Sequence, residues 1–176
     1  FQSTGANTVQ CINYTKADGT PVASSGGGNK SLWLPAIPND AATNTERLPG
    51  AAVTLTDGVT EYASATWCVP DDFTSLTSLK VYWVAAGTGN AWVKMDGFAR
   101  NDGDVRASGG TDDTIALAAY AATAEDVNVT DITAAWNGLT FNANEWITIE
   151  FDRSGGEAED TIGSLVWVYG FQVVYA

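Results

Sequence analysis

Residues 164–176, SLVWVYGFQVVYA, carry the strongest structural signal in the chain. The side chains of a β-strand point alternately to its two faces, and in this stretch both faces are apolar. We expect one face to hold Leu165, Trp167, Tyr169, Phe171, Val173 and Tyr175, and the other to hold Val166, Val168 and Val174. A strand that is apolar on both faces needs cover on both. This segment therefore predicts a strand that is covered by other parts of the chain or by a neighbouring subunit.

The strand pattern continues upstream of this segment. In EWITIEFDR, residues 145–153, Ile147, Ile149 and Phe151 share one face, while the opposite face is mostly polar. Further strands are predicted at 51–57, 60–69, 79–86, 91–100, 114–120 and 124–130, although the alanines of IALAAYAA could instead form a short helix. Asp57-Gly58 is a strong hairpin signal. Frequent turns and almost no helix predict an all-β fold, a jelly-roll-like antiparallel β-sandwich.

The domain organisation follows from a change in pattern near residue 50. Residues 1–50 contain a turn-rich, Gly- and Ser-rich stretch and short apolar runs, and we interpret them as an N-terminal arm with outer strands. Residues 51–176 form the predicted β-sandwich body. The 176 residues suit one domain, and no apolar run is long enough to span a membrane.

Charge and composition exclude several classes of function. The net charge is −13, from 8 basic and 21 acidic residues, so binding of nucleic acid through a basic patch is excluded. The chain has no histidine, which removes Ser-His-Asp and Cys-His catalysis. We find no nucleophile, phosphate or zinc motif and expect a protein that is not an enzyme. A glycosidase pair among Asp96, Glu150 and Asp152 is the catalytic alternative, against the interpretation of a solvated strand face.

The two cysteines, Cys11 and Cys68, lack metal-binding or redox spacing. They form either one disulfide, which suits an extracellular or virion setting, or two buried thiols; we predict the disulfide. Asn13, Asn29 and Asn128 each begin a possible glycosylation sequon. Arg153 and Asp160 flank the last loop and suggest a structural ion pair.

One loop is a candidate cation site. Asp102 and Asp104 belong to an oxygen-rich stretch that could hold Ca²⁺, although its spacing does not match an EF-hand. The alternative is a hydrated turn. No other cofactor or metal is expected.

Seven tryptophans are many for this length. Trp33, Trp92 and Trp146 lie on the more polar faces of their predicted strands, and Trp92 and Trp146 are candidates for stacking on sugar rings. The alternative is packing within the core and between subunits. For subunit contacts we expect an interface formed by Trp167, Tyr169, Phe171 and Tyr175.

Several segments resemble one family of domains. YASATW at residues 62–67, VYWVAAGTGNAWV at 81–93, and Arg153 followed by EDTIGSLVWVYGFQVVYA at 159–176 are similar to β-sandwich domains encoded in tailed-virus genomes. The resemblance implies a jelly-roll domain on a virion surface, as a head decoration, head fibre or tail fibre. It implies assembly with itself and with other virion proteins, and it implies no catalytic residue.

The leading hypothesis is therefore a non-enzymatic structural protein of a virion surface, acting by homo-oligomeric assembly. The first alternative is a carbohydrate-binding or receptor-binding module, and the second is a subunit of an extracellular filament whose arm adds a strand to the next subunit. An exposed tryptophan row beside a concave groove would favour the carbohydrate-binding module.

Overall fold

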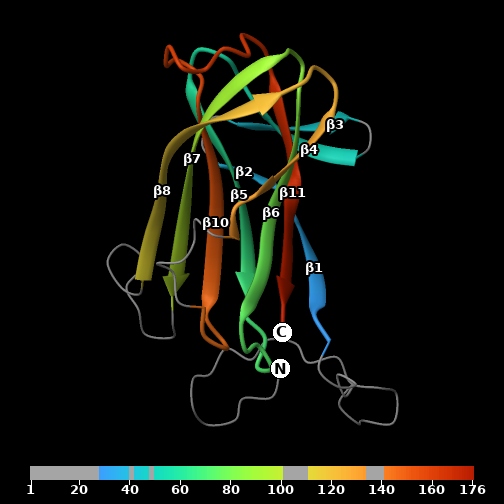
Figure 1. Ribbon diagram of the computed structural model, residues 1–176, viewed down its shortest axis with the longest axis vertical. Helices are drawn as coiled ribbons and strands as arrows, with labels where there is room; N and C mark the ends of the chain where they lie inside the picture. Colours follow the sequence, from blue (N-terminus) through green and yellow to red (C-terminus); the bar gives the residue numbers. More distant parts are fainter. Residues whose placement is uncertain (1–27, 40–41, 48–49, 101–110, 134–140) are drawn as a thin grey trace.

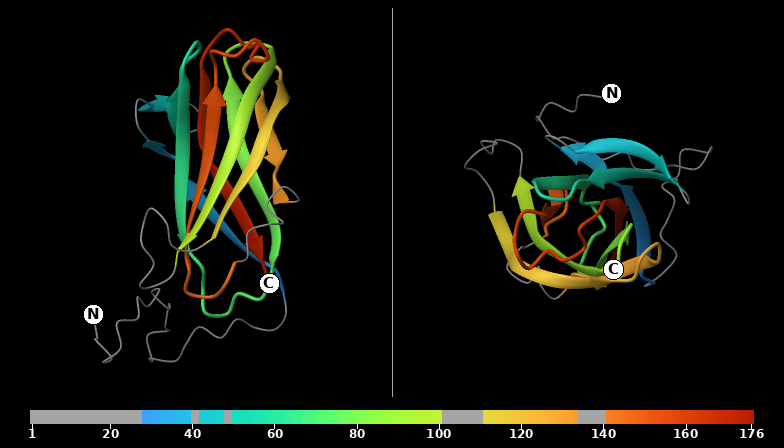
Figure 2. Two further views of the ribbon diagram at one scale, coloured as in Figure 1. Left: turned by 90° about the vertical axis from the view of Figure 1, so that its left-hand side faces the viewer. Right: turned by 90° about the horizontal axis from the view of Figure 1, so that it is seen from above.

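Two antiparallel sheets pack face to face in the computed structural model, which describes residues 28–39, 42–47, 50–100, 111–133 and 141–176 (Figures 1 and 2). The six-stranded sheet contains β3 (Thr43–Arg47), β4 (Gly50–Leu55), β11 (Val166–Tyr175), β6 (Leu76–Ala85) and β9 (Val127–Asp131) in that order, with β1 (Lys30–Pro35) also paired to β11. The five-stranded sheet contains β2 (Ile37–Asn39), β5 (Thr60–Cys68), β10 (Trp146–Ser154), β7 (Gly89–Arg100) and β8 (Thr111–Ala122) in that order. The predicted all-β, jelly-roll-like sandwich is confirmed.

The N-terminal strands belong to both sheets. β1 pairs with β11, β2 pairs with β5, and β3 pairs with β4. Leu34 of β1 joins the core between the sheets. Residues 30–47 thus supply outer strands of the sandwich, while the expected arm over residues 1–27 lies outside the described residues and stays a prediction.

The turn at Asp57-Gly58 is not a hairpin, and that expectation is wrong. β4 lies in the six-stranded sheet and β5 in the other, so the turn carries the chain from one sheet to the other. Gly58 has a φ of 79°, and its N–H donates to Gly155 O at 3.1 Å in the loop that follows β10. The chain turns where its local chemistry predicts a turn, but the partner of each strand comes from elsewhere in the chain.

Residues 111–122 form strand β8 and not a helix. Alanine is compatible with a helix, but β8 pairs with β7 from Gly89 to Ala99, and this ladder pairs the backbone groups along the edge of β8 that faces β7. Tertiary pairing therefore overrides the helical propensity of IALAAYAA.

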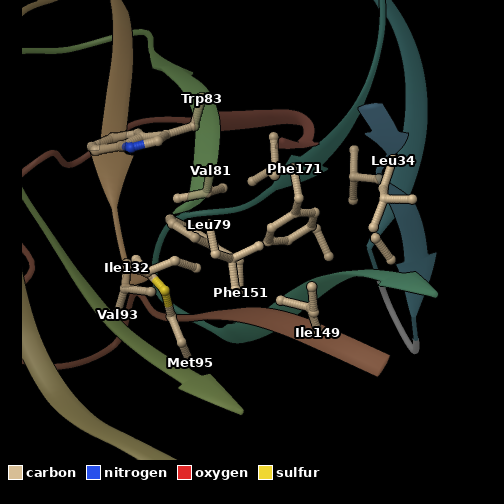
Figure 3. Close-up of a cluster of buried hydrophobic side chains, with 14 of the residues drawn as sticks. Leu34, Leu79, Val81, Trp83, Val93, Met95, Ile132, Ile149, Phe151 and Phe171 are labelled. Atoms are coloured by element: carbon tan, nitrogen blue, oxygen red, sulfur yellow. The ribbon is translucent and has the colours of Figure 1, made fainter. Parts of the chain in front are cut away.

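The core lies between the sheets and is built from the inward faces of the strands (Figure 3). Trp83 of β6 and Phe151 of β10 are fully buried, with ring centroids 6.0 Å apart. The other residues labelled in Figure 3 are Leu34, Leu79, Val81, Val93, Met95, Ile132, Ile149 and Phe171. Ile147, Ile149 and Phe151 share the inward face as predicted.

The central strand β11 changes the facing of its side chains at a bulge. Its pairing register with β6 shifts between Val168 and Gly170, so Trp167 and Tyr169 lie in the outer apolar cluster, whereas Phe171 and Tyr175 lie in the core. The prediction that these four aromatic residues share one face is wrong, because a bulge adds one residue to a period-two pattern. Both faces of the strand are apolar, as expected.

The buried Arg153 joins one end of the two sheets. Its Nε and Nη2 donate to Asp160 Oδ2 and Oδ1, both at 2.8 Å, and Nη1 donates to Ser164 O at 2.7 Å and Leu55 O at 3.3 Å. The predicted structural ion pair between Arg153 and Asp160 is confirmed.

Candidate functional site

A groove of about 340 Å³ opens on the outer face of the six-stranded sheet. Five strands contribute to its walls, so its shape depends on the whole sheet. The lining residues are Trp33 and Pro35 from β1, Gly50 and Ala51 from β4, Tyr82 from β6, Val127 from β9 and Tyr169 from β11. None of these side chains is charged, and three of them are aromatic.

The position of Trp33 depends on Gly170. β1 alternates, with Leu34 pointing into the core and Trp33 on the outer face, where it is 48% exposed. Gly170 pairs with Pro35 across the ladder, and a Cβ added to Gly170 would lie 2.8 Å from the Trp33 ring carbon Cζ2. The missing side chain at the bulge therefore leaves the space that the indole ring occupies.

The aromatic rings of the groove hold one another in place. The rings of Trp33 and Tyr82 are arranged edge to face, with centroids 5.2 Å apart and an interplanar angle of 74°. Tyr169 is buried in the outer cluster with Trp167, Ala52 and Val84. A rigid apolar wall beneath a half-exposed indole is suited to a flat ligand with an apolar face.

A polar row borders the groove. Gln172 of β11 lies opposite Trp33 on one side and opposite Lys80 of β6 on the other, and Lys80 lies opposite Asp131 of β9. Tyr82 Oη donates to Gln172 Oε1 at 3.0 Å. Gln172 Nε2 donates to the hydroxyl of the exposed Ser31 at 3.2 Å. Hydrogen-bonding groups thus lie directly beside the apolar surface.

The Asp131 carboxylate is held in its ionised form. Hydrogen bonds from the Thr133 hydroxyl at 2.6 Å and from the Thr133 N–H at 3.0 Å lower the pKa of Asp131. Burial opposes this effect, and the positive charge of Lys80 adds to it. The cation of Lys80 therefore has a carboxylate opposite it in the same row.

The two predicted sugar-stacking residues lie on the other sheet and far from each other. Trp92 and Trp146 both belong to the outer face of the five-stranded sheet, where Trp146 is 52% exposed. Trp146 pairs with Arg100, which is 100 − 92 = 8 residues from Trp92 on β7. At roughly 3.3 Å per residue this places them about 26 Å apart. They do not form one platform, and a stacking role for either of them stays a prediction.

The candidate carboxylates lie between these tryptophans and contact a lysine. Asp96 pairs with Glu150, and Lys94 pairs with Asp152. Lys94 Nζ lies 2.7 Å from Asp96 Oδ2 and 3.9 Å from Asp152 Oδ2. Burial raises the pKa of Asp152, the charge of Lys94 lowers it and Asp96 raises it again. The hydrogen bond to Asp96 raises the pKa of Lys94. Because the Lys94 ammonium contacts both Asp96 and Asp152, we interpret these carboxylates as ion-paired groups on a strand face and not as a catalytic pair.

The other predicted sites divide between described and undescribed residues. Cys68 is disulfide-bonded, and since Cys11 lies outside the described residues, the Cys11–Cys68 pairing stays a prediction. Asn29 is exposed next to β1. Asn128 lies in β9, and its Nδ2 donates to Asp126 O at 3.0 Å. Asn13, Asp102 and Asp104 fall outside the described residues.

The described residues contain neither a metal-binding cluster nor a membrane-spanning helix. No group of three or more Cys, Asp or Glu side chains there is placed to hold a metal ion. No helix in the same part of the chain has the length and apolar character to cross a membrane.

Sequence reasoning points to Trp33 but misses the groove. Tyr82 and Tyr169 line the groove with Trp33, and they come from strands that are distant in the sequence. The bulge places Tyr169 and Phe171 on opposite faces, although the strand pattern predicts that they share one. The one available signal is Gly170, a residue without a side chain within a strand of large apolar residues.

Comparison with known proteins gives similarity in fold only. No family model matches the chain, and no curated protein matches it. Similar solved structures include a family 36 carbohydrate-binding module in complex with calcium and xylotriose (14% identity, TM-score 0.43, covering 82% of this chain and 98% of that chain). A second is the family 11 carbohydrate-binding module of a cellulosomal cellulase of Clostridium thermocellum (13% identity, TM-score 0.45, covering 86% of this chain and 97% of that chain). A third is an exo-β-1,3-galactanase from Phanerochaete chrysosporium with galactose (14% identity, TM-score 0.46, covering 86% of this chain and 30% of that chain).

At these identities and TM-scores the neighbours carry no argument about the function of this chain. The β-sandwich that the resemblance to tailed-virus domains implied is confirmed by the two sheets themselves. The implied virion role stays a prediction. Fold and site together define a β-sandwich domain with an aromatic groove on one sheet face.

Proposed function

We propose that the protein is a carbohydrate-binding module and that it holds a glycan in the groove beside Trp33. The observation that carries the proposal is the half-exposed indole at the edge of an apolar groove, with Tyr82 and Tyr169 in its walls. One face of a pyranose ring presents C–H groups, and such a face packs on an aromatic ring while its hydroxyls remain at the edge. Gln172 and Ser31 lie where such hydroxyls would need partners.

The size of the groove favours a short ligand segment. A volume of about 340 Å³ lies at the lower end of the roughly 300–1,000 Å³ that small-molecule sites occupy. The groove therefore holds a short stretch of a glycan, and the remainder of a polysaccharide extends along the sheet surface. Binding of this kind needs no catalytic residue, and it places the protein at an extracellular location where glycans are exposed.

The test is affinity electrophoresis in gels that contain single neutral polysaccharides, with Trp33→Ala compared with the parent. We expect a neutral polysaccharide that retards the parent to retard Trp33→Ala far less. Loss of one aromatic platform costs about 1.4 kcal/mol, or about tenfold in affinity. Trp146→Ala is the comparison variant, because Trp146 is similarly exposed but lies on the other sheet, where sugar stacking is the rival prediction. If the glycan binds beside Trp33, the mobility of Trp146→Ala equals that of the parent.

Two results contradict the proposal: a parent that no polysaccharide retards, or equal losses in Trp33→Ala and Trp146→Ala. The second candidate function is homo-oligomeric assembly, as in a virion or filament protein, and the exposed Val127 (56%) and Val129 (49%) of the edge strand β9 favour it. In that case Trp33→Ala would change the sedimentation of the protein. With a glycan site, Trp33→Ala and the parent sediment alike.

A further inference from the structure

The outer face of the six-stranded sheet carries two adjacent rows of different chemistry. One row across the strands runs through Pro35, Gly170 and Tyr82 and continues to Val129. The neighbouring row runs through Trp33, Gln172, Lys80 and Asp131. The indole of Trp33 starts in the polar row and extends over Gly170 into the apolar row. A ring stacked on this indole therefore has its edge beside Gln172.

Gln172 offers both a donor and an acceptor to such a ring. A glutamine amide carries two N–H donors and an oxygen with two lone pairs. Ser31 takes one donor and Tyr82 takes one lone pair. The remaining N–H and lone pair match a sugar hydroxyl, which accepts one hydrogen bond and donates another. The bond to Tyr82 also fixes the orientation of the amide.

The charges of this row oppose an anionic ligand. Lys80 is the cation nearest to Gln172 in the row, and the carboxylate opposite it, Asp131, is held ionised by Thr133. The row therefore has no net positive charge to offer a carboxylate or sulfate. The net charge of −13 adds a repulsive field at low ionic strength.

We infer that the ligand of this groove is an uncharged glycan whose hydroxyls hydrogen-bond to Gln172, and that glycans rich in uronic acid or sulfate are rejected. The inference rests on the proposed function and names its ligand class. Gln172 is the residue that selects for hydroxyls, and Asp131 is the residue that selects against anions.

The first experiment removes the hydrogen bonds and keeps the shape. Gln172→Met has a side chain of similar length without the amide. On a neutral polysaccharide that retards the parent, we expect Gln172→Met to bind about tenfold more weakly. Urea unfolding of the variant verifies that it is folded under the conditions of the gel. Unchanged affinity of the folded variant overturns the role of Gln172.

The second experiment tests the charge in the same groove and does not depend on Gln172. Polygalacturonate is the anionic probe, used at physiological salt, where the field of distant charges is screened beyond about 8 Å. We expect no retardation of the parent and measurable retardation of Asp131→Asn, because the amide oxygen of this variant keeps an acceptor for Thr133 while Lys80 loses its opposing charge. Retardation of the parent, or no change in Asp131→Asn, overturns the selection against anions.

The two proposals fail in different ways. If Trp33→Ala loses affinity while Gln172→Met keeps it, the glycan site stands and the inference about its ligand class falls. If the parent binds polygalacturonate through Trp33, the site again stands and the neutral ligand class falls. If no polysaccharide of either kind retards the parent, both proposals fall together.

Discussion

Arg153 shows at the scale of one residue how a charge can be buried in this sandwich. Its guanidinium is fully buried and its hydrogen bonds go to Asp160, Ser164 and Leu55. Removing one member of a buried ion pair leaves the other without compensation, which costs about 3–5 kcal/mol. We therefore expect the stability of the fold with Arg153 buried to depend strongly on the carboxylate of Asp160. Asp57, 3.4 Å from Arg153 Nη2 and partly exposed, contributes less.

The first stability prediction concerns Asp160→Asn. We expect its free energy of unfolding at pH 7 to fall by about 3 kcal/mol, measured by urea denaturation. Asp57→Asn, the matched control on the same guanidinium, should lose less than about 1 kcal/mol. Equal effects of the two substitutions would show that the bidentate contact is not the dominant one.

The pH dependence of this difference follows from the pKa of Asp160. Burial raises this pKa, but the hydrogen bond from Arg153 and the N–H groups of Trp92 and Ile162 outweigh burial and lower it. A carboxyl whose pKa is lowered by folding stabilises the protein at every pH above its pKa in the unfolded chain, which is about 3.9. This stabilisation is lost as the pH falls through the lower pKa of the folded protein. The stability gap between the parent and Asp160→Asn should therefore be constant from about pH 7 to pH 5 and shrink below about pH 4.

At the scale of the element, strand β11 joins the core to the groove. Its bulge at Gly170 directs Phe171 into the core and leaves Trp167 and Tyr169 on the outer face. Gly170 also permits the close approach of β1, because a Cβ there would collide with Leu34 O and with the Trp33 ring. One glycine thus determines both the facing of the strand and the position of the proposed stacking residue.

We predict that Gly170→Ala loses about 1–3 kcal/mol in unfolding free energy, since backbone of β1 has to move to make room. Trp33 should move as well, so glycan affinity should fall together with stability. The measurements are urea unfolding followed by tryptophan fluorescence, and affinity electrophoresis of the folded variant. Gly50→Ala is the control for stability alone, because a new Cβ there meets no atom within 4 Å but Gly50 itself lines the groove. Equal unfolding free energies of the two variants would show that the close approach of β1 to Gly170 does not limit the size of the side chain at this position.

At the scale of the whole molecule, the disulfide of Cys68 has its predicted partner in the sequence before β1. Cys68 ends β5 and is disulfide-bonded, and we predict that its partner is Cys11, which is 68 − 11 = 57 residues away. In the chain-entropy account, closing a loop of this length stabilises the fold by about 4 kcal/mol.

Peptide mapping without reductant should recover a linked pair of peptides that contain Cys11 and Cys68. Reductant should lower the thermal midpoint of the parent, whereas a Cys11→Ser, Cys68→Ser double variant should be insensitive to reductant and less stable from the start. Two free thiols in the native protein would exclude the pairing. An intermolecular bond would instead appear as a covalent dimer on a gel without reductant.

The sequence by itself determined the approximate positions of most strands of the β-sandwich body and the alternation of residues along strands without a bulge. The alternation in EWITIEFDR predicted that Ile147, Ile149 and Phe151 are buried, and it did so because strand periodicity depends only on the local backbone. Arg153 and Asp160 were recognisable as a pair because a cation and a carboxylate that flank one short loop are held close together by the chain itself. The absence of histidine likewise needs no fold to exclude a histidine-based catalytic set.

Only the tertiary structure decided which strands meet and where a concave surface forms. Asp57-Gly58 turns the chain in the expected place, but the long-range ladders place β4 and β5 in different sheets. The bulge next to Gly170 reverses the facing of half of β11. Because both faces of this strand are apolar, the shift does not show in the alternation of its residues, and the glycine is its one local sign. The groove combines five strands that are far apart along the chain, so its shape is a property of their packing and not of any local stretch of sequence.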